Sequence, residues 1–307
     1  MESSGDAAIL TESLVRDFDG VRAVDGVDLR IPSGEIYGFL GPNGAGKSTT
    51  VHMLCTLLSP TGGRARVAGY DVGTQPGRVR LRIGVALQEA ALDPKQTGTE
   101  FLRLQGRLYG LTRKEVAQRV DELAELIDLG GFLDRLVGTY SGGMKRRLDL
   151  AAALIHNPEI VFLDEPTTGL DPVSRVQVWS EVRRLNQQLG ITIFLTTQYL
   201  EEADELAHRV GIIDNGRIVA EGTPTALKKA VGADVIIVRV DGDPGSACSV
   251  LEQVRGVQSV EVHGSELVIA TEVVVRDLTL RTPTLDDVFL DLTGTHIERD
   301  DTEEDPP

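Results

Sequence analysis

The sequence has few cysteines and fewer basic than acidic residues. Its two cysteines, Cys55 and Cys248, are too few for a disulfide framework, so a reducing compartment fits them best. The 31 Lys and Arg residues face 47 Asp and Glu residues, which gives a formal net charge of −16. A chain this acidic has no general attraction to phosphate backbones or anionic lipid. The charge therefore argues against nucleic acid as a partner.

Long hydrophobic runs are also missing. No apolar run reaches the ~20 residues that a transmembrane helix needs, and runs such as Leu150–Ile155 have the length of core segments. The first ten residues are acidic and lack the basic-then-apolar order of a signal peptide. These features predict a cytosolic protein, which would need another chain to span the membrane if it works there.

The composition is otherwise that of a globular protein, with 41% hydrophobic and 25% charged residues over a length of 307. This length suggests about two domains. Short apolar runs alternate with helical patterns through residues 7–227, which predicts an α/β fold. We expect strands and helices, in chain order, at strand 36–40, helix 46–58, strand 160–164, helix 173–189, strand 191–196, and a hairpin in 212–219 that turns at Asp214-Asn215-Gly216. The pattern is almost entirely helical between Glu100 and Asn157, which predicts a helical subdomain of about residues 89–158 beside the sheet.

The pattern changes near residue 228. Residues 228–297 predict a small α+β domain, with a strand at 235–240, a helix at 247–255, and a hairpin of 257–263 and 266–270. Residues 298–307 are dominated by acidic side chains and end in two prolines. This composition predicts a solvated, disordered tail.

A glycine-rich segment follows the expected strand 36–40 and opens the next helix. It matches the phosphate-binding pattern Gly, any four residues, Gly-Lys-Ser/Thr, in the strand–loop–helix setting that this pattern requires. Its glycines allow backbone N–H groups to point at a phosphate, and the helix N-terminus adds positive partial charge. We expect Lys47 to reach the β- and γ-phosphates and Ser48 to ligate Mg²⁺. The nucleotide-binding residues predicted here are Gly41, Pro42, Asn43, Gly44, Ala45, Gly46, Lys47, Ser48 and Thr49.

A second apolar strand ends in two acidic residues, Asp164 and Glu165. Strand ends and phosphate-binding turns meet at the same edge of an α/β sheet, so both carboxylates should lie beside the glycine-rich loop. There Asp164 would hold Mg²⁺ and Glu165 would polarise the attacking water. The pair means little alone, but it is a strong signal in a chain with a phosphate-binding loop.

A third motif specifies the family. Ser141-Gly142-Gly143 opens another helix before the acidic strand. It resembles the signature motif of ATP-binding-cassette (ABC) ATPases, and the two motifs described above are the other elements that this family shares. The resemblance implies a P-loop core of ABC type and a head-to-tail dimer, in which the signature of one subunit covers the ATP held by the other.

Three further positions resemble this family's pattern. Gln88 corresponds to the glutamine of the loop that touches Mg²⁺ and borders the helical subdomain. Asp171 lies in a Thr-Gly-Leu-Asp run that is similar to the D-loop, which communicates across the dimer. Phe18 lies where the family stacks an aromatic ring on adenine. On the residues alone, Gln88 could equally be a surface glutamine and Phe18 a half-buried strand aromatic.

One position departs from the family pattern. The switch position after the strand 191–196 usually carries His, and here it is Gln198, which can donate a hydrogen bond to the γ-phosphate but cannot carry a charge. An alternative is that Gln198 only caps the strand end and faces solvent. Glutamine here, with the ending in residues 283–294, resembles the daunorubicin-resistance-type drug exporters. Catalytic roles are therefore expected for Glu165 and Gln198.

The resemblance implies an ATPase subunit that uses ATP and Mg²⁺ to power multidrug, antibiotic or lipid efflux. Its partners would be a separately encoded ABC-2 type permease and a second cassette, giving a homodimer at the cytoplasmic face of the cell membrane. One alternative is a soluble cassette ATPase acting on nucleic acid or ribosomes, which the acidic charge and the single cassette disfavour. Another is a regulatory ATP-binding protein without catalysis, against which the presence of Glu165 argues.

Overall fold

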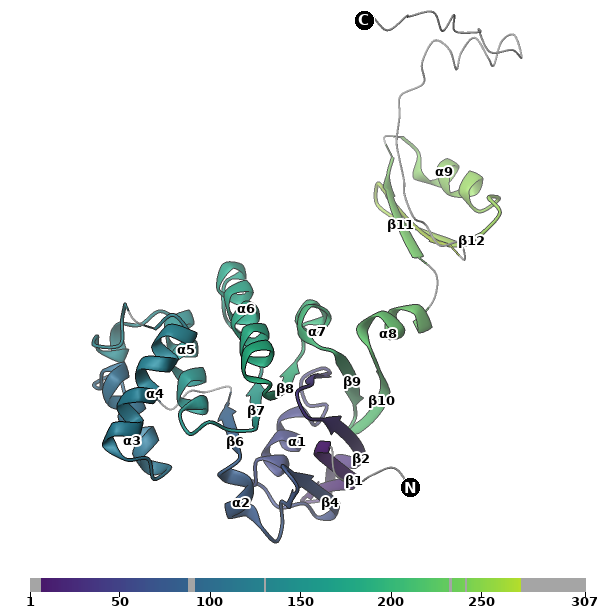
Figure 1. Ribbon diagram of the computed structural model, residues 1–307. Coiled ribbons are helices and arrows are strands. Elements are labelled where there is room, and N and C mark those ends of the chain that lie inside the picture. Colours follow the sequence, from purple (N-terminus) through teal and green to yellow (C-terminus); the bar gives the residue numbers. More distant parts are fainter. Residues whose placement is uncertain (1–6, 88–91, 130, 232–233, 241, 272–307) are drawn as a thin grey trace, which may run out of the picture. The chain divides into compact units, whose positions relative to one another are not determined.

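The computed structural model describes residues 7–87, 92–129, 131–231, 234–240 and 242–271 (Figure 1). The chain divides into two compact units, Met1–Ala230 and Val231–Pro307. Three of the sequence predictions lie outside the described residues: Gln88, the exporter-like ending in residues 283–294, and the acidic tail.

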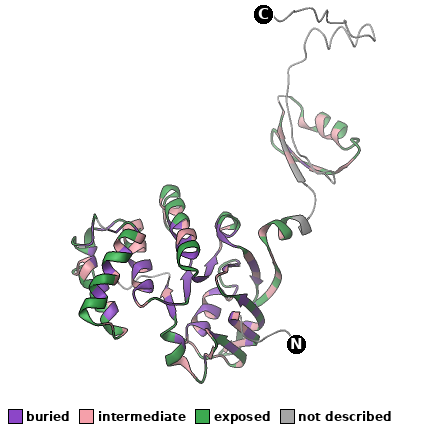
Figure 2. Ribbon diagram, in the orientation of Figure 1, coloured by how far each residue is buried: buried purple, intermediate pink, exposed green. Residues whose placement is uncertain are grey.

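A six-stranded sheet forms the centre of the first unit, in the order β10-β9-β3-β8-β7-β6. Its first five strands along the chain run parallel, and the last is antiparallel to its neighbour. Every residue of three of these strands is buried, as expected for parallel strands covered on both faces (Figure 2). The predicted α/β class is confirmed. The strands are β3 (Ile36–Leu40), β6 (Ile83–Ala86), β7 (Ile160–Asp164), β8 (Thr192–Thr197), β9 (Arg209–Asp214) and β10 (Arg217–Gly222).

A second, antiparallel sheet of order β2-β1-β4-β5 packs on the same core. It consists of β1 (Ala7–Phe18), β2 (Val21–Pro32), β4 (Gly62–Val67) and β5 (Tyr70–Asp71). Helix α1 (Lys47–Leu54) contacts β2 and β4 of this sheet and β7 of the central one. The helix was expected to reach Leu58 but ends at Leu54, because Thr56 has the left-handed φ of 62°. Packing on both sheets fixes the start of α1, where the glycine-rich loop ends.

Helices α3, α4 and α5 gather beyond β6 around a shared apolar core (Figure 1). Two of them begin with a capping box, Thr97 with Glu100 and Thr112 with Glu115, in which side chain and backbone satisfy each other's hydrogen bonds. The other helices flank the central sheet or connect its strands. The helices of this unit are α2 (Pro76–Arg80), α3 (Gly98–Leu108), α4 (Arg113–Leu126), the 3₁₀ turn η1 (Val137–Thr139), α5 (Gly142–Leu154), α6 (Pro172–Leu189), α7 (Leu200–Leu206) and α8 (Pro224–Val231).

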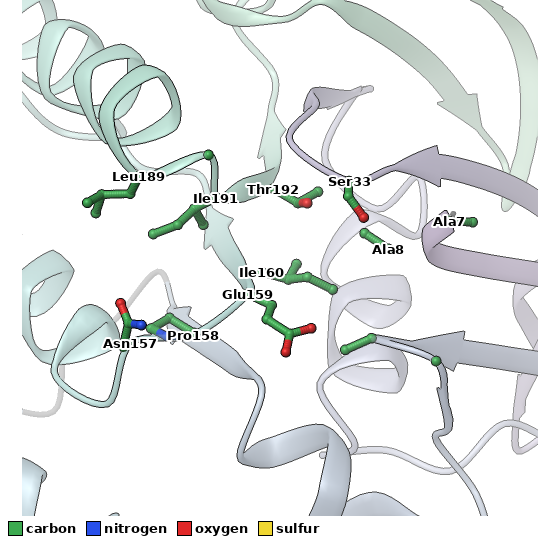
Figure 3. A pocket seen from close by; sticks show the side chains of 13 residues that line it. Ala7, Ala8, Ser33, Asn157, Pro158, Glu159, Ile160, Leu189, Ile191 and Thr192 are labelled. Atoms are coloured by element: carbon green, nitrogen blue, oxygen red, sulfur yellow. The ribbon is translucent and has the colours of Figure 1, made fainter. Parts of the chain in front are cut away.

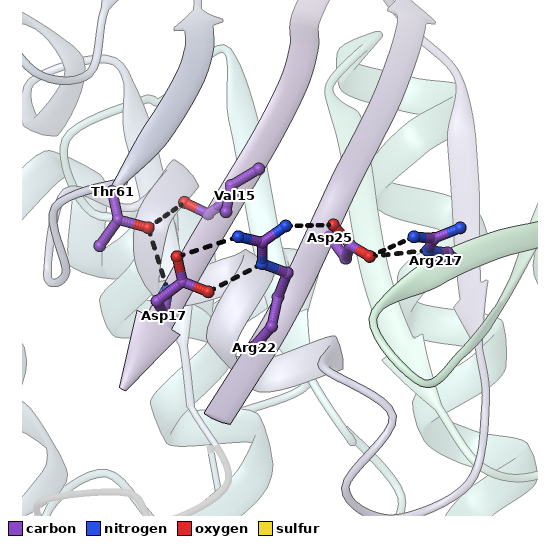
Figure 4. Close-up of polar contacts among 6 residues, drawn as sticks. All are labelled: Val15, Asp17, Arg22, Asp25, Thr61 and Arg217. Carbon is purple, nitrogen blue, oxygen red and sulfur yellow. Dashed lines mark hydrogen bonds and ion pairs between the residues drawn. The ribbon is translucent and has the colours of Figure 1, made fainter. Parts of the chain in front are cut away.

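The turn between β9 and β10 reaches the glycine-rich loop. Asn215 and Gly216 both have positive φ, 46° and 78°, as the tight hairpin turn predicted from the sequence requires. The Gly216 N–H donates to the Ala45 carbonyl at 2.9 Å, and the Gly216 carbonyl accepts from Asp25 N at 2.8 Å. Figure 4 shows alternating charges that continue this connection: Arg217 pairs with Asp25, which pairs with Arg22. The turn thereby ties the loop to the strand pair β1–β2.

The second unit is described as a three-stranded antiparallel sheet of order β11-β13-β12 with one helix. Its elements are β11 (Asp234–Arg239), α9 (Pro244–Leu251), β12 (Val257–His263) and β13 (Glu266–Thr271). The helix expected over 247–255 was misplaced: it begins three residues earlier and ends at Leu251. The reason is the cap, since the Asp243 carboxylate accepts from the backbone N–H groups of Gly245 and Ser246 at 3.2 and 3.1 Å, and Pro244 suits the first helical position.

Candidate nucleotide site

The glycine-rich loop curls tightly between β3 and α1. Gly44 and Gly46 have φ values of 82° and 106°, a region that other residues adopt at a cost, and Gly46 caps the helix. A Cβ on Gly41 would lie 2.3 Å from the Ile213 carbonyl oxygen. The glycines therefore permit a conformation and a closeness of approach that side chains would prevent.

The Lys47 side chain is buried, with 4% of its surface exposed. Its Nζ donates to the carbonyls of Gly41 and Pro42 at 2.8 and 3.0 Å and lies 3.4 Å from Glu165 Oε1. A buried ammonium needs such partners because desolvation of an unpaired charge is costly. The sequence prediction that Lys47 and Glu165 share one site is therefore met by a direct ion pair.

Asp164 receives hydrogen bonds from two hydroxyl groups. Ser48 Oγ donates to Asp164 Oδ1 at 3.3 Å, and the Thr196 hydroxyl donates to the same oxygen. Thr196 is fully buried at the end of β8, and its Oγ1 also accepts from the Glu165 backbone N–H at 3.0 Å. No role was expected for Thr196 from the sequence. The only available signal was a hydroxyl residue at the end of a strand that neighbours the acidic strand.

Glu165 has an unusual backbone for its residue type. Its φ is 48°, in the left-handed region that a non-glycine residue enters at an energetic cost. Its carboxylate is nearly buried and accepts a hydrogen bond from Thr168 Oγ1 at 3.2 Å. The backbone therefore turns sharply after β7 and directs Glu165 toward Lys47.

A cavity of about 380 Å³ lies in front of these groups. It joins the glycine-rich loop, the acidic strand end and the switch position, so Gln198 shares a site with Lys47 and Glu165. Thr168, the first residue of the run that resembles the D-loop, also lines it, and so does Ala23, for which no role was expected. The lining residues are Ala23, Asn43, Gly44, Gly46, Lys47, Ser48, Thr49, Glu165, Thr168 and Gln198.

The signature residues and Asp171 of the D-loop stand apart from this cavity. Ser141 caps α5 by accepting from Met144 N at 3.2 Å, and Asp171 caps α6 by accepting from Ser174 N at 3.0 Å. Ser141, Gly142 and Asp171 are exposed, and none of them lines the cavity. Phe18, at the end of β1, is 40% exposed and does not line it either. The Arg16 guanidinium lies 4.4 Å from the centre of the Phe18 ring.

A larger hollow, of about 590 Å³, lies at the opposite ends of the central strands (Figure 3). Residues near the starts of β7 and β8 line it, including Glu159 and Thr192. Glu159 is paired there with Arg82 at 2.5 Å. None of the predicted site residues lies in this hollow, so volume alone does not identify the site.

Comparison with known proteins identifies the family. Residues 24–168 match the family model described as ABC transporter. The chain is 46% identical to the daunorubicin/doxorubicin resistance ATP-binding protein DrrA of Streptomyces peucetius, over 99% of this chain and 98% of that protein. The chain belongs to the ATP-binding subunits of ABC transporters. This ABC subunit is also 40% identical, over 95% of its length and 99% of the relative's, to the Nod factor export ATP-binding protein I of Rhizobium sp. (strain N33).

Solved structures show the same fold. The structure of cbiO1 from Clostridium perfringens, part of the ABC transporter complex cbiONQ, covers 73% of this ABC subunit and 91% of its own chain. The TM-score is 0.68 and the sequence identity 26%. The P-loop core of ABC type that the motifs predicted is thereby confirmed.

Membership in the family also establishes the activity: this ABC subunit is an ATPase that binds and hydrolyses ATP and works with a separate membrane permease. The relatives named above belong to resistance and export systems, and they give no support to the nucleic-acid alternative. No helix among the described residues is long and apolar enough to cross a membrane.

Proposed function

We propose that this subunit powers the export of antibiotic or other drug-like molecules, or of lipid, through a separately encoded ABC-2 type permease that holds it at the cytoplasmic face of the cell membrane. Relatives from three bacterial genera support the proposal by their names. They are a daunorubicin/doxorubicin resistance protein of Streptomyces peucetius, a linearmycin resistance protein of Bacillus subtilis, and a Nod factor export protein of Rhizobium. The first of these is similar along almost the full length of both chains, including the second unit.

The cavity accounts for nucleotide binding. The loop Gly41–Thr49 and the start of α1 would direct N–H groups at the phosphates, and Lys47 would neutralise them. The Lys47 ammonium already lies against two carbonyls and Glu165, so the phosphates would compete with Glu165 for it. We infer that nucleotide binding releases the Glu165 carboxylate toward the attacking water.

The oxygen atoms of Ser48 and Asp164 fit Mg²⁺, which takes hard oxygen ligands and keeps several of its sites for phosphate and water. Bound there, Mg²⁺ would neutralise charge on the phosphate oxygens. Gln88 would complete this set, but it lies outside the described residues. Thr196 keeps Asp164 oriented through its hydroxyl.

Glu165 and Gln198 are the residues that we assign to the hydrolysis step. The Glu165 carboxylate would accept the proton of the water that attacks the γ-phosphorus, and the Gln198 amide would donate a hydrogen bond to a γ-phosphate oxygen. Both line the same cavity. Gln198 has no proton to exchange near neutral pH, so proton transfer rests on Glu165.

The site would be completed by a second copy of the chain. Ser141, Gly142 and Gly143 lie outside the chain's own cavity, and Ser141 and Gly142 are exposed at a helix N-terminus suited to bind an anion. In a head-to-tail homodimer they would cover the γ-phosphate of the partner, and Asp171 would lie near the same interface. Phe18, which is 40% exposed and has the Arg16 guanidinium over its ring, would stack on adenine.

A transport assay tests the proposal. The chain is expressed with a candidate ABC-2 type permease from the same organism in a drug-sensitive host, and retention of daunorubicin, which is fluorescent, is measured in cells. We expect lower retention than with Lys47→Ala, which should bind nucleotide poorly. Equal retention with the wild-type chain and with Lys47→Ala, across daunorubicin, doxorubicin, linearmycin and lipid probes, would contradict export.

A further inference from the structure

Glu202 is a buried carboxylate in the first turn of α7, four residues after Gln198. None of its surface is exposed. Its Oε1 accepts two hydrogen bonds, from Thr167 Oγ1 at 2.9 Å and from Trp179 Nε1 at 3.0 Å. One carboxylate oxygen therefore connects α7 to two other segments of the chain.

Both partners belong to the segment that follows Glu165. Thr167 is fully buried and lies two residues after Glu165. Trp179 lies on α6, the helix that Asp171 caps. Glu202 is thus bonded to the loop after β7 and to the helix after the D-loop, while its own helix follows the switch residue directly.

A carboxylate in this position is costly to maintain. Burial raises the pKa of Glu202, since the charged form loses hydration. Its Oε2 has no hydrogen bond of good geometry, although the Thr197 side chain on β8 favours the charged form, and the carboxylate has no ion pair within 4.0 Å, among the residues that the structure describes. An apolar or neutral side chain would fill the space without this penalty. Packing alone therefore does not explain why this position carries a carboxylate.

A positive charge on the signature helix acts on the same group. Arg146, on α5, attracts the Glu202 carboxylate electrostatically and pairs with Asp149 at 3.2 Å. Arg146 Nη1 also donates to the Leu87 carbonyl at 3.0 Å. Arg146 therefore connects the helix that Ser141 caps to Leu87, the residue after β6.

We propose that Glu202 is a positioning residue for hydrolysis. Its carboxylate bonds the segment that follows Gln198 to the loop that follows Glu165. This bond fixes the distance between the two loops, so that both side chains can reach the γ-phosphate at the same time. This inference rests on the proposed roles of Glu165 and Gln198. Glu202 itself does not line the nucleotide cavity, so its effect is expected on turnover and not on ATP binding.

Steady-state ATPase kinetics of the full chain with its permease test the proposal. Glu202→Gln keeps the shape and removes the charge, and Thr167→Val removes one donor. We expect each to lower kcat about tenfold with the KM for ATP changed less than about twofold, because one hydrogen bond to a charged group is at stake. Thr167→Ser, which keeps the hydroxyl, should retain near wild-type kcat.

Thr192→Val is the matched control. Thr192 is also buried, and its hydroxyl accepts one hydrogen bond, from Gly34 N at 2.9 Å, but it lies at the opposite end of β8, beside the hollow of Figure 3. It should reduce thermal stability as Thr167→Val does and leave kcat unchanged. A loss of kcat that is equal in the two variants would reduce Glu202 to a structural role and overturn the proposal.

Trp179 supplies an independent readout because it is the single tryptophan of the chain. In Glu202→Gln the amide oxygen can still accept from Trp179 Nε1, but the negative charge beside the indole is lost, so the fluorescence emission of the folded protein should shift. The double variant Thr167→Val/Glu202→Gln should be no slower than the slower single variant, since one change removes the bond between Thr167 and residue 202 and the other weakens that same bond. Additive losses would contradict the coupling.

The remaining outcomes are distinct. Unchanged kcat in both Glu202→Gln and Thr167→Val overturns the proposal, and if Glu202→Gln does not fold, Thr167→Val against Thr167→Ser decides alone. Wild-type turnover in Glu165→Gln would instead remove the proposed hydrolytic role on which this inference rests.

Discussion

Thr196→Val should remove the one hydroxyl group that is bonded both to the Asp164 carboxylate and to the Glu165 backbone N–H. The Thr196 hydroxyl donates to Asp164 Oδ1 and accepts from Glu165 N, and the side chain is fully buried. Valine has nearly the same shape, so the change removes the hydroxyl and little packing. The perturbation therefore isolates one group that the sequence analysis did not identify.

The bond to Asp164 determines the magnitude. Glu165 N also donates to the Thr196 carbonyl oxygen at 3.1 Å, and this backbone bond survives the substitution. The bond to the Asp164 carboxylate is lost, and a hydrogen bond to a charged group contributes ~1.5–3 kcal/mol. At about 2–4 °C per kcal/mol for a unit of this size, the unfolding temperature should fall by about 3–12 °C. If the whole contribution appears in the transition state, turnover falls roughly 10- to 150-fold.

Two assays measure this prediction. Differential scanning calorimetry gives the unfolding temperature, and a Mg²⁺ titration of ATPase activity should show a higher Mg²⁺ requirement, since Asp164 is no longer held in place. Thr192→Val on the same strand should lose stability without loss of turnover. Wild-type turnover and Mg²⁺ requirement in Thr196→Val would refute the role assigned to the Asp164 support.

Other predictions follow from the site and from one buried histidine. Lys47→Ala should weaken ATP binding strongly, and unchanged affinity in isothermal titration would contradict the phosphate-loop assignment. Gln198→Ala should lower turnover roughly 10- to 150-fold for loss of a ~1.5–3 kcal/mol bond, and wild-type turnover would favour a Gln198 that only caps the strand end. Burial lowers the pKa of His156 to about 4. The His156 ring stacks on Tyr109, and its Nε2 is hydrogen-bonded to the Ile83 carbonyl oxygen. As the pH drops from about 6.5 to 4, the His156 imidazole is protonated in the unfolded chain but not in the folded one. The free energy of unfolding should therefore fall by ~1–2 kcal/mol, a value reduced for the partial exposure of the ring. Denaturant unfolding of His156→Phe should lack this loss.

The sequence predicted correctly those strands that are marked by a short apolar run and by turn residues directly after it. Residues 36–40 and 160–164 are short apolar runs with turn residues after them, and both form the expected strands. Lys47, Glu165 and Gln198 come together because parallel strand ends meet at one edge of the sheet. Sequence spacing was sufficient for these residues.

The missed features depend on tertiary packing. Nothing in the sequence around Thr196 or Glu202 indicates which neighbouring segment each side chain faces, and that is what gives both residues their partners. The ends of α1 and α9 were also misplaced, because a left-handed Thr56 and the Asp243 cap decide them locally. Apolar periodicity predicts where a helix can run, whereas single residues such as Thr56 and Asp243 decide where it ends or begins.

Complementation between two inactive variants tests the composite site most directly. A Lys47→Ala chain keeps its signature and loses its own phosphate loop, whereas a Ser141→Arg chain keeps its loop and loses its signature. Mixed in a head-to-tail homodimer, they form one site with both defects and one intact site. We predict that neither variant alone hydrolyses ATP and that an equal mixture recovers about a quarter of wild-type turnover, since half of the dimers are mixed. No recovery above the separate variants would contradict a site built from two chains.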